Sequence, residues 1–335
     1  MSTMAPNGEL PGHDSGRTFD GEDPPSTPSH TPPRGWVRTR IACHIVTVVS
    51  LCAAALCYVS YRMDRLELRA VARRVVGESA APSDKVLALL HWVYQNQGFR
   101  ENRRYFLIPG LRATPLQVLE AGGDCADKSR LLTALLREVG VPCTMVLCFD
   151  PLTRKPVHTV VDAEIENGHD MIVDPVYDLH FPRLRSADYY GLLELRKDPG
   201  ILPRRLDELA SAASRKSPVR SYNRASAVYD HASSINWKKN GLTSLAHALL
   251  RTVWGEDVYR FHRPLVLEEP KLYAGALSLI PAVMAVSVVG YVRRCRKVRS
   301  ADHRLFGPHS GPYRLKSPSP SDNCESGATA NRIPR

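Results

Sequence analysis

Two stretches of the chain are apolar and free of formal charge over 21 residues each. They run from Ile41 to Tyr61 and from Leu272 to Val292. Each can cross a hydrocarbon core of about 30 Å as a helix, and each has tyrosines near its ends, where amphipathic rings favour the membrane interface. Globular core helices seldom stay uncharged for so long, and a 40-residue leader is too long for a cleaved signal peptide. The pattern therefore predicts two transmembrane helices, of which the first is an uncleaved anchor.

Between these stretches, apolar positions first repeat with the period of a helix. A predicted helix over 85–96, beginning at Ser83 or Asp84, has one apolar face formed by Val86, Leu89, Leu90 and Val93. A second predicted helix over 124–139 has an apolar stripe formed by Leu131, Leu132, Leu135 and Leu136. Both patterns are typical of helices that pack one face against a core.

The pattern then changes to that of strands, at residues 143–149, 158–165 and 170–174. Helices followed by an antiparallel sheet form an α+β fold. Residues 186–270 are expected to form polar helices and loops, and no chemistry is recognisable in them.

Composition divides the chain into six segments. We expect a disordered Pro-rich leader over 1–40, a transmembrane helix over 41–61, an α+β domain over 62–182, a mostly helical accessory segment over 183–271, a second transmembrane helix over 272–292 and a basic disordered tail over 293–335.

The formal net charge of the 335 residues is +11, and its distribution indicates membrane placement. Basic residues that directly follow the second span place the C-terminus in the cytoplasm, so the N-terminus lies there too and residues 62–271 lie outside. A basic cluster over 62–74 argues for the opposite orientation, but charge bias weakens for long translocated segments. The excess charge lies in the accessory segment and the tail, and no aromatic–basic motif of a nucleic-acid module is present. We therefore expect membrane lipids, and not nucleic acid, among the partners.

Three residues combine into a candidate catalytic site: Cys125, His158 and Asp174. Cys125 follows Gly122-Gly123-Asp124 at a predicted helix start, where free N–H groups and the macrodipole stabilise a thiolate. A histidine can take the proton from the thiol and return it to a leaving group, and a carboxylate can orient the imidazole. This chemistry uses no cofactor and no metal ion, and no C-x-x-C pattern of a structural zinc site is present.

Strand alternation tests whether His158 and Asp174 can meet. Odd-numbered positions of both strands are apolar and are expected to share the core face, which leaves His158 and Asp174 together on the other face. The sequence Glu166-Asn167-Gly168 suits a three-residue loop with Gly168 in the left-handed conformation, which pairs Val160 with Asp174. Asp174 is then a diagonal neighbour of His158 at about 7–8 Å, whereas a two-residue loop would separate them onto opposite faces.

The stretch from Gly123 to Pro142, GDCADKSRLLTALLREVGVP, resembles the cysteine helix of the transglutaminase-like superfamily, a branch of the papain-like thiol enzymes. The stretches 158–161 (HTVV) and 173–175 (VDP) resemble its histidine and aspartate motifs in the same chain order, and 89–93 (LLHWV) resembles the helix before the cysteine. The resemblance covers about residues 80–180. It implies a papain/transglutaminase-like core, with the cysteine helix packed on an antiparallel sheet, and acyl transfer through a thioester.

Two positions depart from the family pattern, because Val160 and Met171 stand where members often have aromatic residues. These departures concern the substrate cleft and leave substrate preference open. The N–H of Cys125 is the first candidate for stabilising an oxyanion, with Gln117 and Tyr105 as candidates for the second donor.

The sequence therefore favours a membrane-anchored, bacterial-type thiol enzyme that transfers an acyl group or hydrolyses an amide in a peptide or another envelope-associated substrate. The alternative is a catalytically silent module that binds a partner and acts as a scaffold in an envelope or polysaccharide assembly. The complete triad disfavours this alternative, and the pattern does not indicate an oligomeric state.

Overall fold

The computed structural model describes residues 34–77, 80–101, 104–150, 152–184, 186, 188–212, 222 and 229–305, with the side chains of Arg34, Ala212 and residues 299–305 left aside. Residues 1–33 of the predicted leader and 306–335 of the predicted tail lie outside this description.

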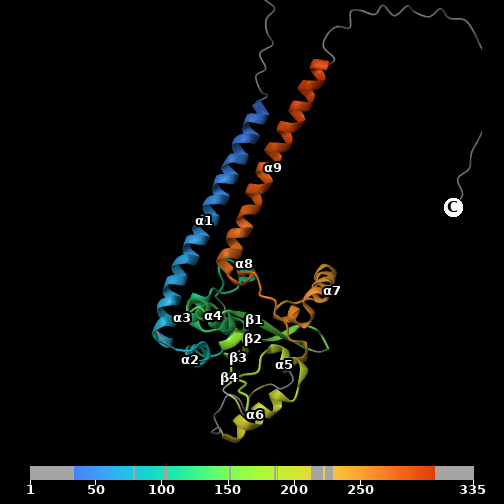
Figure 1. The fold of residues 1–335 in the computed structure, drawn as a ribbon. Helices are drawn as coiled ribbons and strands as arrows, with labels where there is room; N and C mark the ends of the chain where they lie inside the picture. Colours follow the sequence, from blue (N-terminus) through green and yellow to red (C-terminus); the bar gives the residue numbers. More distant parts are fainter. Residues whose placement is uncertain are drawn as a thin grey trace, which may run out of the picture. The chain divides into compact units, whose positions relative to one another are not determined.

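Each apolar stretch forms part of a longer helix (Figure 1). The first lies in α1 (Arg34–Val76) and the second in α9 (Pro270–Leu305). Both helices are long and apolar enough to cross a membrane. The helix of the first stretch continues through the basic residues that follow, since these include no glycine or proline before Gly77, whose φ is +75°.

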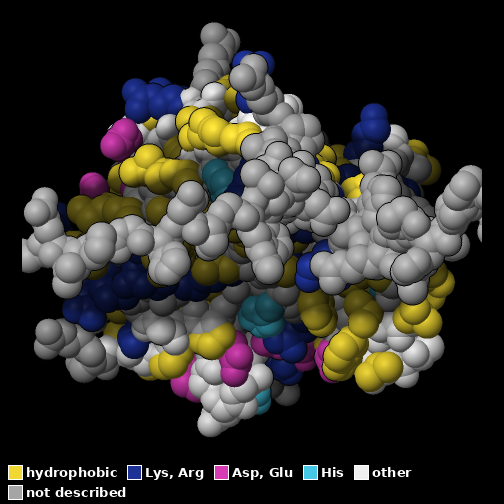
Figure 2. All heavy atoms as spheres, turned by 90° about the horizontal axis from the view of Figure 1, so that it is seen from above, with side chains coloured by type: hydrophobic (Ala, Val, Ile, Leu, Met, Phe, Trp, Pro, Cys, Tyr) yellow, Lys and Arg dark blue, Asp and Glu magenta, His cyan; other side chains and the backbone are white. Residues whose placement is uncertain are grey.

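Near residue 60, α1 contacts the start of α9. Lys271 Nζ lies 2.6 Å from Asp64 Oδ2 and 2.7 Å from Ser60 Oγ. At Gly275 an added Cβ would lie 3.4 Å from Cys57 Cβ, so a small residue suits this approach. Large apolar side chains of both helices are exposed, and a space-filling view shows surface hydrophobic side chains beside Lys and Arg (Figure 2).

Between α1 and the sheet, the described chain forms three further helices and one 3₁₀ turn. They are α2 (Pro82–Gln95), the 3₁₀ turn η1 (Pro109–Leu111), α3 (Pro115–Ala121) and α4 (Cys125–Glu138). The predicted apolar faces of α2 and α4 are buried in a common core. The helical pattern of the sequence therefore identified the correct faces.

The start of α2 differs from the prediction. Ala81 is the N-cap and Pro82 is the first helical residue, because proline has the φ of a helix and lacks the N–H that would be unpaired there. Ser83 does not cap the helix. Its N–H and its hydroxyl donate to Glu166 Oε1, at 3.1 and 2.9 Å, and so connect α2 to the loop after β2.

Four antiparallel strands form one sheet in the order β1-β2-β3-β4. They are β1 (Cys143–Phe149), β2 (Pro156–Glu164), β3 (Asp170–Asp174) and β4 (Leu179–His180). The first three correspond to the predicted strands, and together with the helices they give the predicted α+β fold.

The predicted register between β2 and β3 is confirmed. Val161 pairs with Val173, and Ile165 N–H donates to His169 O at 2.7 Å, which closes a three-residue loop. Gly168 is left-handed as expected, with φ of +71°, and Asn167 shares that conformation with φ of +60°.

Both faces of the sheet are buried, which the sequence did not indicate. The odd-numbered residues of β2 and β3 face α2 and α4, as predicted. The opposite face is covered by a second core, in which Val146, Val160 and Ile172 meet apolar residues of the accessory segment. That segment contributes α5 (Leu192–Lys197), α6 (Ile201–Ala212) and the 3₁₀ turn η4 (Tyr229–His231).

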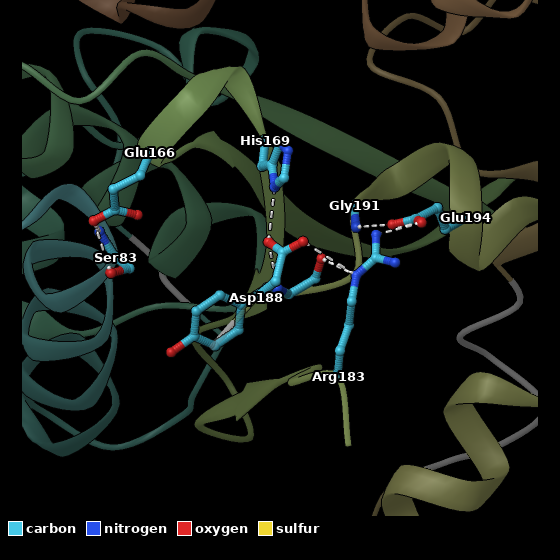
Figure 3. A network of polar contacts seen from close by, with 8 residues as sticks. Ser83, Glu166, His169, Arg183, Asp188, Gly191 and Glu194 are labelled. Carbon is cyan, nitrogen blue, oxygen red and sulfur yellow. Dashed lines mark hydrogen bonds and ion pairs between the residues drawn. The ribbon is translucent and has the colours of Figure 1, made fainter. Parts of the chain in front are cut away.

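A chain of polar contacts connects the loop and β3 to the start of the accessory segment (Figure 3). His169 Nδ1 lies 3.0 Å from Asp188 Oδ1, and Arg183 lies 3.4 Å from the other oxygen of Asp188. Arg183 also donates to Glu194 at 2.5 Å, and Glu194 accepts from Gly191 N–H at the start of α5. The first helix of the accessory segment is thereby attached to the hairpin that bears His158 and Asp174.

The rest of the accessory segment forms α7 (Gly241–Trp254), the 3₁₀ turn η5 (Gly255–Arg260) and α8 (Leu265–Glu268). Arg260 in η5 donates to Asp162 on β2 at 3.1 Å and also to Asp170 on β3. Arg137 on α4 forms an ion pair with Glu268 on α8. These contacts attach the segment to the sheet and to the cysteine helix.

Candidate active site

Two successive glycines bring the chain to the start of α4. Gly122 has φ of +76°, and a Cβ there would lie 2.8 Å from the carbonyl oxygen of Gly98. At Gly123 a Cβ would lie 2.4 Å from Asp127 Cβ. Arg100 N–H donates to Gly123 O at 3.2 Å, so residues 98–100 run alongside this turn. Only residues without a side chain fit both positions.

Asp124 and Cys125 follow this turn. Asp124 is the N-cap of α4, and its Oδ1 accepts from Asp127 N–H at 2.9 Å. Cys125 is the first helical residue and is half-buried. Its sulfur therefore lies at a helix end that presents unpaired N–H groups, which stabilise a nearby anion.

Side chains one turn further along α4 fix the helix in place. Ser129 is fully buried, and its hydroxyl donates to Thr159 O on β2 at 2.8 Å. Lys128 is also buried and donates to the last carbonyl groups of α2, Val93 O at 3.0 Å and Tyr94 O at 3.1 Å. Burial lowers the pKa of Lys128. The Ser129 contact is made beside His158, so it sets the spacing between the cysteine helix and the histidine strand.

His158 and Asp174 meet as the register predicted. His158 Nε2 lies 2.6 Å from Asp174 Oδ2, and both side chains are buried. The other oxygen of Asp174 accepts from Val176 N–H at 2.9 Å. The carboxylate is therefore fixed on both sides, and it orients the imidazole with Nδ1 left for another partner.

Cys125 lies near the same imidazole, because its thiol is among the groups that raise the pKa of His158. Burial lowers the pKa of His158, but the charge and hydrogen bond of Asp174 outweigh burial and, with Cys125, raise it to about 10. The structure thus joins His158 to Asp174 directly and places Cys125 near enough to act on the same imidazole. Because the imidazolium is favoured, it can stabilise a thiolate on Cys125.

Two tyrosines that sequence reasoning missed enclose His158. The ring centroid of Tyr177 lies 5.9 Å from that of His158, and the centroid of Tyr222 lies 6.4 Å away with its ring edge-on. The two tyrosine rings are 4.5 Å apart. Tyr177 follows Asp174 by three residues and could have been noticed, whereas Tyr222 lies in the accessory segment, where no pattern singled it out.

The structure places the two predicted candidates for a second oxyanion donor differently. Gln117 forms a capping box with Thr114, accepting from its N–H at 2.9 Å. Tyr105 lines an open hollow of about 340 Å³ beside Asp124 and Asp127, together with residues of the 101–113 segment. The side-chain oxygen of Gln117 thus caps α3, whereas Tyr105 lies beside the helix start that bears Cys125.

Within the described ranges, no group of three His, Cys, Asp or Glu side chains is arranged to hold a metal ion.

Residues 69–175 match the sequence model of the Transglutaminase-like superfamily. This part of the chain is a transglutaminase-like domain, α+β with an antiparallel sheet. A comparison with curated proteins gives no match.

Two solved structures are similar to part of the chain. One is named "a Putative Cysteine Protease" from Cytophaga hutchinsonii, with 23% identity over 33% of this chain and 37% of that chain, and a TM-score of 0.28. The other is named "a Putative Protease" from Parabacteroides distasonis, with 15% identity over 38% of this chain and 30% of that chain, and a TM-score of 0.26. The chain therefore spans about a third of the length of each.

Proposed function

We propose that this chain is a thiol enzyme that transfers an acyl group, or hydrolyses an amide, through Cys125, His158 and Asp174. The observation that carries the proposal is the buried 2.6 Å contact between His158 Nε2 and Asp174, with Cys125 at the start of α4 near enough to raise the pKa of the same imidazole. Buried titratable pairs cost free energy to desolvate, and such pairs with perturbed pKa values cluster at functional sites.

The proposed reaction proceeds in two halves. His158 holds the proton of Cys125, and the thiolate attacks the carbonyl carbon of the substrate. The Cys125 N–H at the helix start stabilises the oxyanion, and His158 then returns the proton to the leaving amine. Water or a second amine resolves the thioester, with His158 accepting a proton from the incoming nucleophile and returning it to the sulfur of Cys125.

The hollow beside Asp124 is the proposed entry for the substrate. Arg104, Arg112 and Glu101 line it together with Tyr105. These groups can hydrogen-bond a peptide backbone or pair with charged side chains next to the amide that reacts, which supports a peptide or another amide-containing substrate.

Labelling of Cys125 tests this function. Membranes containing the full chain are treated with iodoacetamide near neutral pH, and modification of each cysteine is quantified by mass spectrometry. We expect rapid modification at Cys125 and none in the same peptide of Cys125→Ala, which should also lose activity against acyl donors and amine acceptors. Cys295→Ala removes an exposed thiol outside the domain and should leave both readouts unchanged. A Cys125 that reacts no faster than Cys295 would instead favour the silent binding module.

We also propose that α1 and α9 anchor the domain in a membrane, with both termini cytoplasmic and residues 62–271 outside. Two arginines of the basic cluster that argued for the opposite orientation, Arg65 and Arg69, form ion pairs with the buried carboxylate of Glu138 on α4. Because these two arginines have a role in packing α1 against α4, their presence need not reflect the orientation of the chain in the membrane. A reporter fused after residue 200 should be active only in its extracytoplasmic form, and cytoplasmic activity would reverse the orientation.

A further inference from the structure

A second pocket lies at the edge of the sheet and shares no lining residue with the candidate triad. It is formed by the end of β1, the turn after it, the segment 231–238, α7 and η5. This segment adds to the edge of β1, because Leu147 N–H donates to Ser233 O at 2.9 Å and Ser233 N–H donates back at 3.0 Å. The pocket volume is about 100 Å³, which exceeds the roughly 10–15 Å³ that one water needs.

The charges that line this pocket are all positive. Arg154, Arg196 and Lys238 contribute cations, and no carboxylate is among the lining residues. In the part of the chain that the structure describes, neither Arg154 nor Lys238 is in an ion pair. The acidic groups whose charges act on these lining residues are Asp230 and Glu256, and Glu256 is paired with Arg251 at 2.6 Å. Asp150 lies in the same turn as Arg154, and its Oδ1 accepts from the N–H groups of Leu152 and Thr153.

Arg196 is the fixed member of this group. Its guanidinium lies 3.6 Å from the centroid of Tyr259 and donates to Ala232 O. A guanidinium held on an aromatic face keeps further N–H groups for an anion and loses little entropy on binding it. Arg154 and Lys238 are exposed and stand at the rim.

The wall of the pocket contains nitrogen atoms without hydrogen bonds. Trp237 is 8% exposed, and its Nε1 is enclosed and has no hydrogen-bond partner among the described residues. His247 Nε2 is likewise enclosed without a partner in that part of the chain. The two rings are stacked with centroids 5.4 Å apart. A buried polar group without a partner is costly, and both rings line the pocket, where a bound ligand would offer hydrogen-bond partners.

The cations of the pocket also affect the pKa values of its two histidines, His231 and His247. Burial lowers the pKa of His231, and Arg154, Arg196 and Lys238 lower it further against the opposing charge of Asp230. Burial also lowers the pKa of His247, with Arg251, Lys238 and Arg196 acting in the same direction and Glu256 opposing. A group of cations that disfavours further protonation favours an anion.

We propose that this pocket binds an organic anion, whose phosphate or carboxylate lies between Arg196, Arg154 and Lys238 and whose apolar part lies against Trp237 and Phe149. Phe149 and Ile235 supply the apolar lining. The anion can be a soluble molecule or the headgroup of a lipid, because the same contacts would serve both.

Calorimetric titration of the full chain in a non-ionic detergent tests the site. The probes are phenyl phosphate, inorganic phosphate and dioctanoyl phosphatidylglycerol. We expect saturable binding of at least one organic probe, tighter than inorganic phosphate because of the apolar lining. Preference for phenyl phosphate would identify a soluble ligand, and preference for phosphatidylglycerol would identify a headgroup.

Neighbouring lysines provide matched controls. Lys238→Glu and Arg154→Glu should weaken binding at least about tenfold. Lys239→Glu and Lys155→Glu change the charge equally at exposed residues outside the lining and should change affinity less than about twofold. Equal losses in both pairs, or no binding of any probe by the unmodified chain, would overturn the proposal, whether or not Cys125 is reactive.

Discussion

At the scale of single residues, the turn before Cys125 depends on the absence of a side chain at Gly123. Gly123 has no Cβ, and Asp127 Oδ2 occupies the space 2.8 Å from where one would be. Asp127 is itself fixed by an ion pair with Arg130 at 2.8 Å, so it cannot move away freely. The turn before Cys125 is therefore close-packed on the side of the helix start.

We expect Gly123→Ala to destabilise the protein by about 1–3 kcal/mol, because overpacking at this site must displace Asp127 or the turn. Cys125 should also react more slowly with iodoacetamide, since the helix start is displaced. Gly110→Ala is the matched control, because a Cβ there meets nothing within 4 Å, and its stability should stay within about 0.5 kcal/mol. Thermal unfolding of both variants measures the difference. Equal stability would mean that the turn relaxes without cost.

At the scale of elements, one hydroxyl determines how α4 lies on the sheet. Ser129 donates to Thr159 O, in the residue after His158. Thr133, one turn further along α4, is also buried, but its hydroxyl has no partner in the described structure. The two residues therefore separate the effect of a helix-to-strand hydrogen bond from that of a buried hydroxyl.

We expect Ser129→Ala to cost about 1 kcal/mol of stability and to slow the alkylation of Cys125, because α4 can shift relative to β2. Thr133→Val should be neutral or stabilising, because it removes a buried polar atom that makes no hydrogen bond. Chemical unfolding gives the stability, and peptide-level alkylation rates give the reactivity. If Ser129→Ala lost stability but kept the rate at Cys125, the contact would serve folding alone.

Elements also show how far the sequence could predict the site. Strand alternation and the loop Glu166-Asn167-Gly168 sufficed for the register that joins His158 to Asp174, because both are local properties of neighbouring strands. The sequence did not predict that the accessory segment covers the sheet face opposite α2 and α4. Tyr222 contacts His158 although it lies 64 residues further along the chain. The sequence of the polar helices in the accessory segment does not indicate which face of the sheet they cover.

At the scale of the whole molecule, buried charge connects the accessory segment to the sheet. Asp162 on β2 is buried, and among the described residues it forms its ion pair with Arg260 from η5. Burial and the charge of Asp170 raise the pKa of Asp162 to about 7, against the opposing effect of Arg260. The folded protein therefore holds a proton on Asp162 at pH values where an unfolded chain, with an ordinary carboxyl pKa, has released it.

The sign of the resulting pH dependence follows. Between about pH 4 and pH 7 the folded state binds more protons than the unfolded state, so the free energy of unfolding falls as pH rises, by at most about 4 kcal/mol from this group. In Asp162→Asn, the free energy of unfolding should depend less on pH between about pH 4 and pH 7, because the amide does not titrate and can still accept from Arg260.

Asp150→Asn is the control, because the pKa of Asp150 is shifted in the opposite direction. Backbone N–H groups of Thr153 and Leu152 lower the pKa of that exposed carboxyl, so its effect on stability is confined to pH below about 4. Thermal unfolding of the full chain in detergent from pH 4 to pH 8 measures all three proteins, and an unchanged slope in Asp162→Asn would show that Asp162 stays ionised in the folded state.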